Sequence, residues 1–267
     1  MKYFLAVITA FLFLQNISAQ DSVYTTKFWV DGPVILGGLG LTAVGVSLVN
    51  SKKDLTMAQL ATKTKDKIPF FDRGNAGYYS EDADNLSYIP FEVSFGIPLV
   101  MGLINKNERQ KYGQVLVLYG ETMAITGALF TLTDGTINRS RPYVYGTNAP
   151  LDKRLGKNAQ RSFFAGHTAA TAAATFFAAK AFQDFNPDSK AKPYVWAAAA
   201  AIPGLVGYLR YKAGMHFLSD NIVGFAIGAG VGILVPQLHK NKIMKNITFM
   251  PAMENGSKGI AVFYVFQ

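Results

Sequence analysis

The sequence predicts an all-α protein: a bundle of five to six apolar, membrane-embedded helices with a short β-hairpin at the C-terminus. Half of the 267 residues are hydrophobic, and they form long uncharged runs separated by polar turns. Several of these runs approach the length of a membrane-crossing helix. Residues 247–267 instead alternate around Asn255-Gly256, a dipeptide typical of hairpin turns.

Residues 1–19 have the organisation of a secretory signal peptide. A charged Lys2 is followed by an apolar run from Tyr3 to Leu14 and by small residues up to Ala19. The run is short for a spanning helix, so we expect cleavage near Ala19 and export of the rest of the chain. An uncleaved anchor is the alternative. Residues 20–240 then form the helical domain and residues 241–267 the hairpin tail.

The chain contains no cysteine and has a net charge of +9. An exported protein without cysteine has neither disulfides nor thiol chemistry, and a cysteine-based zinc site is excluded. The positive charge suits an anionic partner. No basic cluster is interleaved with aromatic residues as in a nucleic-acid groove, so we expect a phosphate compound or anionic lipid, and the membrane, rather than nucleic acid.

The first predicted membrane helix covers residues 33–49, which are uncharged and rich in glycine. Residues 50–89 are polar, and the pattern there predicts only a short helix near residues 55–64. A second apolar run, residues 90–104, contains an acid and an internal proline. These make it the weakest candidate to cross a membrane.

Residues 112–133 form the third helical pattern, and Glu121 lies within it. A carboxylate at that depth should face the protein interior and find a partner, either for structural reasons or in support of a site. The fourth helix is expected over residues 162–182, with Ser162 as its N-cap and His167 in about its first turn.

Residues 194–209 predict a fifth helix and residues 220–238 a sixth. Glycines recur every fourth residue of the sixth helix, at Gly224, Gly228 and Gly232. They form a stripe of small residues for close helix contact, not a phosphate-binding loop. His239 follows in a basic tail, where we expect it to be exposed to solvent.

The join between the fifth and sixth helices contains Arg210, His216 and Asp220. If a helix begins near Met215, the imidazole and the carboxylate lie one turn apart on the same face. The carboxylate can then accept a hydrogen bond from one ring nitrogen and leave the other free as a nucleophile or base. An ordinary Asp–His pair at the start of a helix is the alternative.

Two further clusters lie at helix ends. Arg139 and Arg141 follow the third helix, while Gly166 and His167 begin the fourth, where unpaired N–H groups and the helix dipole favour an anion. In an up-and-down bundle these ends lie on the same side as the join at residues 210–220. The three clusters can therefore converge on one site.

Two imidazoles, several guanidiniums and a carboxylate fit phosphoryl transfer through a covalent intermediate on histidine. The arginines neutralise the phosphate oxygens, one histidine attacks, and the other protonates the leaving oxygen. A metal held by two histidines and a carboxylate is the competing hypothesis. The neighbouring arginines would oppose a cation, so no metal and no cofactor is expected at this site.

The three clusters resemble the motifs of the type 2 phosphatidic acid phosphatase superfamily over about residues 112–238. The third motif of that family is Ser-Arg, five residues, His, three residues, Asp, and it reads LRYKAGMHFLSD here, with Leu209 at the serine position. The second, Pro-Ser-Gly-His, reads FAGH, with Phe164 and Ala165 replacing proline and serine. The first, Lys, six residues, Arg-Pro, keeps Arg141-Pro142 but has Asp134 at the lysine position.

The resemblance implies that His216 becomes phosphorylated, that Asp220 orients it, and that His167 is the general acid. Phosphate would be held by Arg141, Arg210 and the amide of Gly166.

The two departures from the motifs affect the same pocket. Ala165 removes a hydroxyl donor, which slows an enzyme of this kind without abolishing it. Asp134 introduces a negative charge that needs a partner. Arg139 is the expected partner or substitute phosphate ligand, and Lys212 is another candidate.

These observations predict a phosphatase of the bacterial cell envelope that hydrolyses a phosphate monoester or pyrophosphate of a lipid. An exported acid phosphatase for small phosphomonoesters and a catalytically weakened phosphate- or lipid-binding protein are the alternatives. The family pocket also resembles that of vanadate-dependent haloperoxidases, but nothing in the chain indicates halide chemistry. We favour a site facing the periplasm, which requires that residues 33–49 or 90–104 do not cross the membrane, and we expect the latter.

Overall fold

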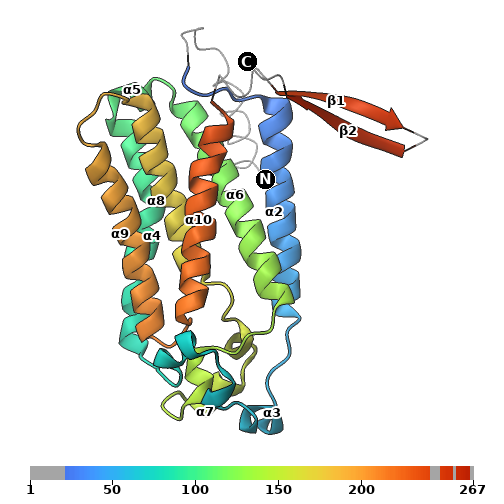
Figure 1. Ribbon diagram of the computed structural model, residues 1–267, viewed down its shortest axis with the longest axis vertical. Helices are drawn as coiled ribbons and strands as arrows, with labels where there is room; N and C mark the ends of the chain where they lie inside the picture. Colours follow the sequence, from blue (N-terminus) through green and yellow to red (C-terminus); the bar gives the residue numbers. More distant parts are fainter. Residues whose placement is uncertain (1–21, 241–246, 255–256, 265–267) are drawn as a thin grey trace, which may run out of the picture.

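Six long helices dominate the computed structural model, which describes residues 22–240, 247–254 and 257–264 (Figure 1). They are α2 (Phe28–Asn50), α4 (Glu81–Ile104), α6 (Tyr112–Thr136), α8 (Gly166–Phe185), α9 (Lys192–Lys212) and α10 (Leu218–Leu238). The shorter helices are α3 (Met57–Ala61), α5 (Lys106–Arg109), α7 (Leu151–Leu155) and the 3-10 turns η2 (Lys65–Lys67), η3 (Phe70–Asn75), η4 (Pro142–Tyr145) and η5 (Lys157–Gln160). The predicted signal peptide lies outside the described residues.

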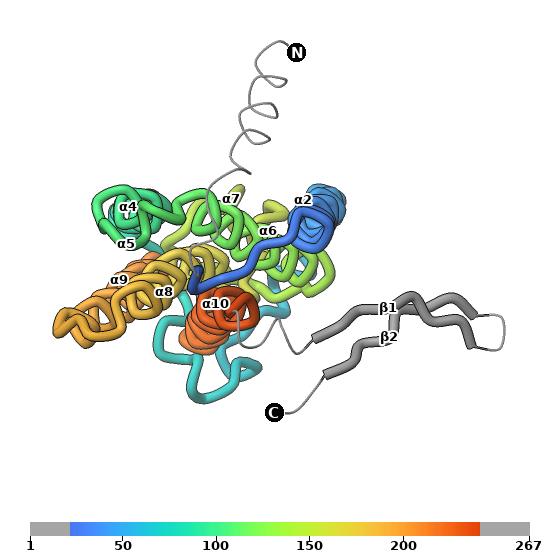
Figure 2. The backbone as a smooth tube through the Cα atoms, turned by 90° about the horizontal axis from the view of Figure 1, so that it is seen from above, coloured from blue at the N-terminus to red at the C-terminus, as the bar shows by residue number. Residues whose placement is uncertain are grey.

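The long helices alternate in direction, as Figure 1 shows. Viewed along the bundle, α8 lies among the others and contacts α4, α6, α9 and α10, while α2 packs along α6 (Figure 2). The end of α6 and the starts of α8 and α10 consequently share one end of the bundle with α3 and α7. The predicted convergence of helix ends is therefore present.

Four described helices are long and apolar enough to cross a membrane, namely α2, α4, α6 and α10. The expectation of five to six such helices was too high, because α8 and α9 do not meet that criterion although they belong to the bundle. Apolar side chains on α2 and α4 face outward, among them Leu36, Val44, Val93 and Ile104. Exposed apolar faces of this kind suit contact with lipid.

The helix α4 begins well before the apolar run at residues 90–104. Ser80 is its N-cap and accepts a hydrogen bond from the amide of Ala83 at 3.2 Å. Acidic residues fill the first turn, where they complement the helix dipole. Pro90 and Pro98 lie inside a continuous helix of 24 residues. The run that we expected not to cross is thus part of a candidate membrane span.

The glycine stripe of α10 packs directly on α8, as predicted. A Cβ atom at Gly224 would lie 2.5 Å from the carbonyl oxygen of Ala165, and one at Gly232 would lie 2.6 Å from that of Ala173. At Gly228 it would overlap the carbonyl of Ala169. Glycine at these positions lets the two backbones approach each other.

The C-terminal segment contains two antiparallel strands, β1 (Ile247–Glu254) and β2 (Ser257–Tyr264). Their register places Ile247 opposite Tyr264. The predicted turn at Asn255-Gly256 lies outside the described residues.

Candidate active site

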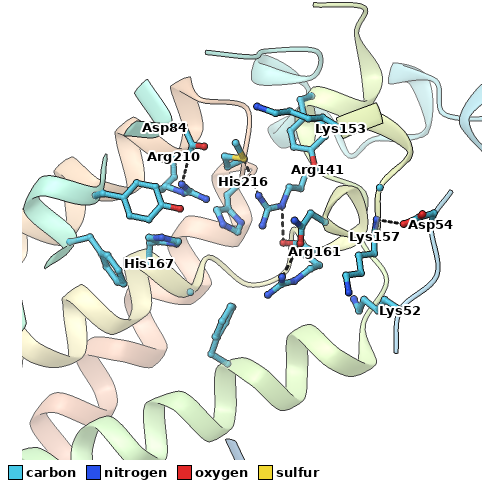
Figure 3. Close-up of a pocket in the computed structure, with 18 of the residues that line it drawn as sticks. Lys52, Asp54, Asp84, Arg141, Lys153, Lys157, Arg161, His167, Arg210 and His216 are labelled. Carbon is cyan, nitrogen blue, oxygen red and sulfur yellow. Dashed lines mark hydrogen bonds and ion pairs between the residues drawn. The ribbon is translucent and has the colours of Figure 1, made fainter. Parts of the chain in front are cut away.

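A cavity of about 1070 Å³ opens at the end of the bundle where α6 ends and α8 begins. Its inner wall carries aromatic side chains from α4 and α6, and its outer wall comes from the loops around α7. Predicted site residues among its lining are Arg141, Gly166, His167, Arg210 and His216. Figure 3 shows the side chains of Arg141, His167, Arg210 and His216 around the same space.

His216 precedes α10, which begins at Leu218 and not near Met215. The carbonyl oxygen of Ser162 lies 2.6 Å from its Nδ1 atom, and a carbonyl can only accept. Nδ1 therefore carries the proton, and Nε2 is left with its lone pair. Ser162 was predicted to be the N-cap of α8. Instead, its backbone carbonyl orients the imidazole of His216.

Asp220 forms no hydrogen bond with the ring of His216 in the described part of the chain, contrary to the prediction. Its Oδ2 atom accepts hydrogen bonds from the hydroxyl of Ser162 at 2.6 Å and from the amide of Phe217 at 2.8 Å. Because it caps the start of α10, its carboxylate turns back toward the preceding loop. Asp220 thereby fixes both segments that hold His216, and its effect on the imidazole passes through Ser162.

The electrostatic surroundings of His216 keep its imidazole neutral. Burial lowers its pKa well below the usual value, and the guanidiniums of Arg141 and Arg210 lower it further. A neutral ring has the lone pair on Nε2 that nucleophilic attack on phosphorus requires.

His167 occupies the first turn of α8, as predicted, and its ring is held by aromatic side chains of α4. Its centroid lies 4.4 Å from that of Phe91 and 5.1 Å from that of Tyr88. Gly166 is needed beside it, because a Cβ atom there would overlap the ring of Phe130. Ala165, the N-cap residue, offers no side-chain cap, so the first amides of α8 keep their capacity to bind an anion.

Two guanidiniums flank the space between the histidines. Arg141 donates to the carbonyl of Arg161 at 3.2 Å and contacts the sulfur of Met215 at 2.9 Å. It forms no ion pair with a carboxylate in the described part of the chain. Arg210 is buried and paired with Asp84 of α4, while its Nε atom has no hydrogen-bond partner. Both side chains have donors to offer a phosphate.

Arg139, which the sequence predicted to be a phosphate ligand, is not among the residues that line the cavity. Its guanidinium binds Asp220 on one side and Asp72 on the other, the latter at 2.6 Å. A guanidinium held by two carboxylates is a structural group. It ties the segment after α6 to the start of α10.

Asp134 is paired with Arg161 and not with the expected Arg139 or Lys212. The carboxylate is buried and accepts from Nε and Nη2 of Arg161 at 2.8 and 2.7 Å. Arg161 itself lines the cavity. The negative charge that replaces the lysine of the motif is therefore neutralised within the site.

Several positioning residues come from the polar segment 50–89, which contains no recognisable motif. Asn75 is fully buried and donates to the carbonyl of His216 at 2.9 Å and to that of Tyr211 at 3.0 Å. Asp72 accepts from the amide of Ser219 at 2.9 Å. Gly214, with a φ of +72°, completes the loop because an L side chain rarely adopts that conformation.

Basic residues extend the cavity away from the histidines. Seven lysines and arginines line it against three aspartates. Burial lowers the pKa of Lys52, whose amino group donates to the carbonyl of Ile137 at 2.7 Å. The rim is lined by Lys52, Lys53, Lys153 and Lys157. An anionic ligand would be drawn to this mouth.

Glu121 and His239 lie together at the other end of the bundle. Glu121 faces the interior, as predicted, and its carboxylate lies 3.4 Å from Nε2 of His239. His239 was expected to be exposed to solvent, but it is buried. The N-terminal segment covers the end of α10 where this residue lies. The amide of Thr25 donates to its carbonyl at 2.8 Å.

A family model described as the PAP2 superfamily matches residues 115–244 of the chain. The matched region contains the three clusters that form the cavity. None of the curated proteins and none of the solved structures matches the chain.

Proposed function

Since residues 115–244 belong to the PAP2 superfamily of phosphatases, we propose that the chain hydrolyses the phosphate monoester or pyrophosphate of an envelope lipid through a phosphohistidine at His216. One observation supports the mechanism most strongly. The proton of His216 is committed to the Ser162 carbonyl, so that Nε2 is the nucleophile, and the same cavity contains Arg141, Arg210 and His167.

The reaction takes two steps. Nε2 of His216 attacks phosphorus while His167 passes a proton to the leaving oxygen, which releases the alcohol or the lipid phosphate. Burial and the charges of Arg210 and Arg141 lower the pKa of His167 to about 3, so the proton that it passes on comes from the bound phosphate monoanion. Water, deprotonated by His167, then attacks the phosphohistidine and releases inorganic phosphate. Arg141, Arg210 and the first amides of α8 stabilise the charge on the equatorial oxygens in both steps.

A lipid substrate is supported by the walls of the cavity. Tyr88, Phe91 and Phe130 line its inner side, where α4 and α6 carry apolar surface toward the bundle exterior. A prenyl or acyl chain can lie against this wall while the phosphate meets the arginines. The outward apolar faces of α2 and α4 give less support to a soluble acid phosphatase, whose apolar runs would have to form a globular core.

The pairing of Asp134 with Arg161 supports an active enzyme over a weakened one. A carboxylate without a partner near the phosphate would repel the substrate. The carboxylate of Asp134 is neutralised by Arg161, so Arg141 keeps its positive charge for the phosphate. The missing hydroxyl at Ala165 remains as a source of slower turnover.

The test is phosphate release from a panel of phosphorylated lipids by detergent-solubilised protein. We expect release from a polyprenyl or glycerolipid phosphate, and a loss of at least about a thousandfold in His216→Ala. Undiminished release in that variant would refute the mechanism. Faster turnover of small water-soluble phosphomonoesters than of every lipid would instead identify an acid phosphatase.

The orientation of the site depends on which side of the membrane Phe28 occupies, because α2 begins at the end opposite the cavity. Cleavage of a signal peptide followed by four crossings would place the cavity on the inner side. A cavity that faces the periplasm, which we favoured from the sequence, requires residue 28 to lie on the inner side or α2 not to cross.

A further inference from the structure

We propose that Asp31, Glu121 and His239 form a structural binding site for a divalent first-row transition ion such as Zn²⁺, at the end of the bundle opposite the phosphatase cavity. The three residues come from α2, α6 and the residue after α10, and all are more than nine-tenths buried. Glu121 lies roughly 20 Å along α6 from Asp134, given the rise of an α-helix. The site is therefore separate from the catalytic one.

The imidazole of His239 is held in the way that is common for metal-binding histidines, with one ring nitrogen hydrogen-bonded to a backbone carbonyl. Nδ1 of His239 donates to the carbonyl of Val235 at 2.8 Å, which leaves Nε2 as the ring atom that is able to bind an ion. The Nε2 atom lies 3.0 Å from Oδ1 of Asp31 and 3.4 Å from Oε2 of Glu121. Donor atoms around a tetrahedral ion with bonds of about 2.05 Å lie roughly 3.4 Å apart.

The carboxylates are also held ready. Oδ2 of Asp31 accepts from the amide of Lys27 at 2.6 Å, so that Oδ1 is turned toward His239. Oε2 of Glu121 is buried and lacks a hydrogen-bond partner. A buried carboxylate oxygen with no donor is costly, and a cation between it and the imidazole would remove that cost.

The charges in the cluster do not balance without a cation. In the described part of the chain, neither Asp31 nor Glu121 forms an ion pair with a lysine or an arginine. Two carboxylates around a neutral imidazole carry two negative charges, which a divalent ion neutralises. A protonated imidazole neutralises only one of them. One nitrogen and two oxygens form a ligand set that first-row divalent ions accept.

An ion here would tie together three helices where the chain enters the bundle. His239 already joins the N-terminal segment to α10, through the hydrogen bond from Thr25 and the bridge between Tyr24 and Lys240. The ion would add α2 and α6 to this junction. We therefore expect it to stabilise the fold and to leave the phosphatase chemistry in place.

Zinc binding to untagged, chelator-stripped full-length protein in detergent tests the proposal. We expect one Zn²⁺ per chain after dialysis, measured by elemental analysis, and a rise in the unfolding temperature of about 5 °C or more with saturating zinc. The near-isosteric variants Glu121→Gln and His239→Gln should weaken binding at least about tenfold and abolish the rise in unfolding temperature.

The matched control removes a histidine from the other site. His216→Ala should still bind one Zn²⁺ with the same rise in unfolding temperature. If zinc is lost in His216→Ala but kept in the Glu121 and His239 variants, the ion belongs to the catalytic cavity and the proposal is wrong. If stripped wild-type protein binds no zinc and its unfolding temperature does not move, the cluster is an ion pair of a protonated histidine with two carboxylates.

Discussion

At the scale of single residues, the pair formed by Asp134 and Arg161 decides how the departure from the family motif is interpreted. The carboxylate of Asp134 lies 2.7 Å from Nη2 of Arg161. A lysine at this buried position would therefore bring two positive charges together, and like charges repel. The lysine of the family motif therefore requires a site in which position 161 is not a positive charge facing position 134. Here the cation is supplied from position 161.

We predict that Asp134→Lys lowers the stability of the protein by roughly 2 kcal/mol, because a broken buried pair leaves an uncompensated charge. Activity should fall as well. Adding Arg161→Ala to Asp134→Lys should recover part of the stability. Thermal unfolding and phosphate release, measured side by side in detergent, check this. A gain of activity in Asp134→Lys would mean that the native site is weakened.

The sequence could supply the residues that line the cavity but not the residues that hold them in place. His167, Arg141, Arg210 and His216 stand in a pattern with fixed spacing, and all four line the cavity. Asn75 lies 141 positions from His216, and no local pattern indicates such a partner. The role of Asp220 was misplaced for a related reason, since it depends on where α10 begins.

At the scale of elements, the contact between α8 and α10 sets the relative position of the two histidines. His167 begins α8 and His216 precedes α10, so any change in the separation of these helices moves one imidazole relative to the other. The glycine stripe of α10 determines that separation, since each glycine faces a carbonyl of α8 or of its N-cap residue.

We predict that Gly228→Ala destabilises the protein and reduces activity at least about tenfold, because the new methyl group would overlap the carbonyl of Ala169. Gly230 on the same helix is the matched control, since a Cβ atom there has nothing within 4 Å. Gly230→Ala should leave unfolding temperature and turnover unchanged. Equal behaviour of the two variants would show that the stripe does not set the helix contact.

The elements themselves were largely predictable, and the errors have physical causes. Long apolar runs located all six long helices. The start of α4 was placed at Pro90 because the apolar run begins there, although Ser80 and the acids after it form an N-terminal capping pattern. The burial of His239 was missed because a basic tail is ordinarily exposed to solvent. The sequence does not show that the segment around Thr25 covers it.

At the scale of the whole molecule, the alternation of the helices fixes which loops share a side of the membrane. The segment between α2 and α4 lies at the cavity end with the loop after α6, whereas the turn between α4 and α6 lies at the other end. The tertiary arrangement thus predicts which loops lie on the same side of the membrane, which hydropathy alone did not.

We predict that reporter fusions after Lys63 and after Gly146 report the same compartment, and that a fusion after Asn107 reports the opposite one. This outcome follows if α4 and α6 both cross the membrane. Fusions after Lys63 and Asn107 that report the same side would show that α4 does not cross. The compartment of the Gly146 fusion identifies the side that the site faces.

The proposed chemistry at His216 is tested most directly by trapping the phosphoenzyme. Solubilised protein is mixed with a lipid substrate carrying radiolabelled phosphate, quenched in alkaline detergent, and analysed for label that is stable to alkali and labile to acid. We predict such label on wild-type protein, none on His216→Ala, and normal labelling of the zinc-site variant His239→Gln. Label that persists in His216→Ala, or phosphate release by wild-type protein with no trapped intermediate at any quench time, would contradict a phosphohistidine at His216.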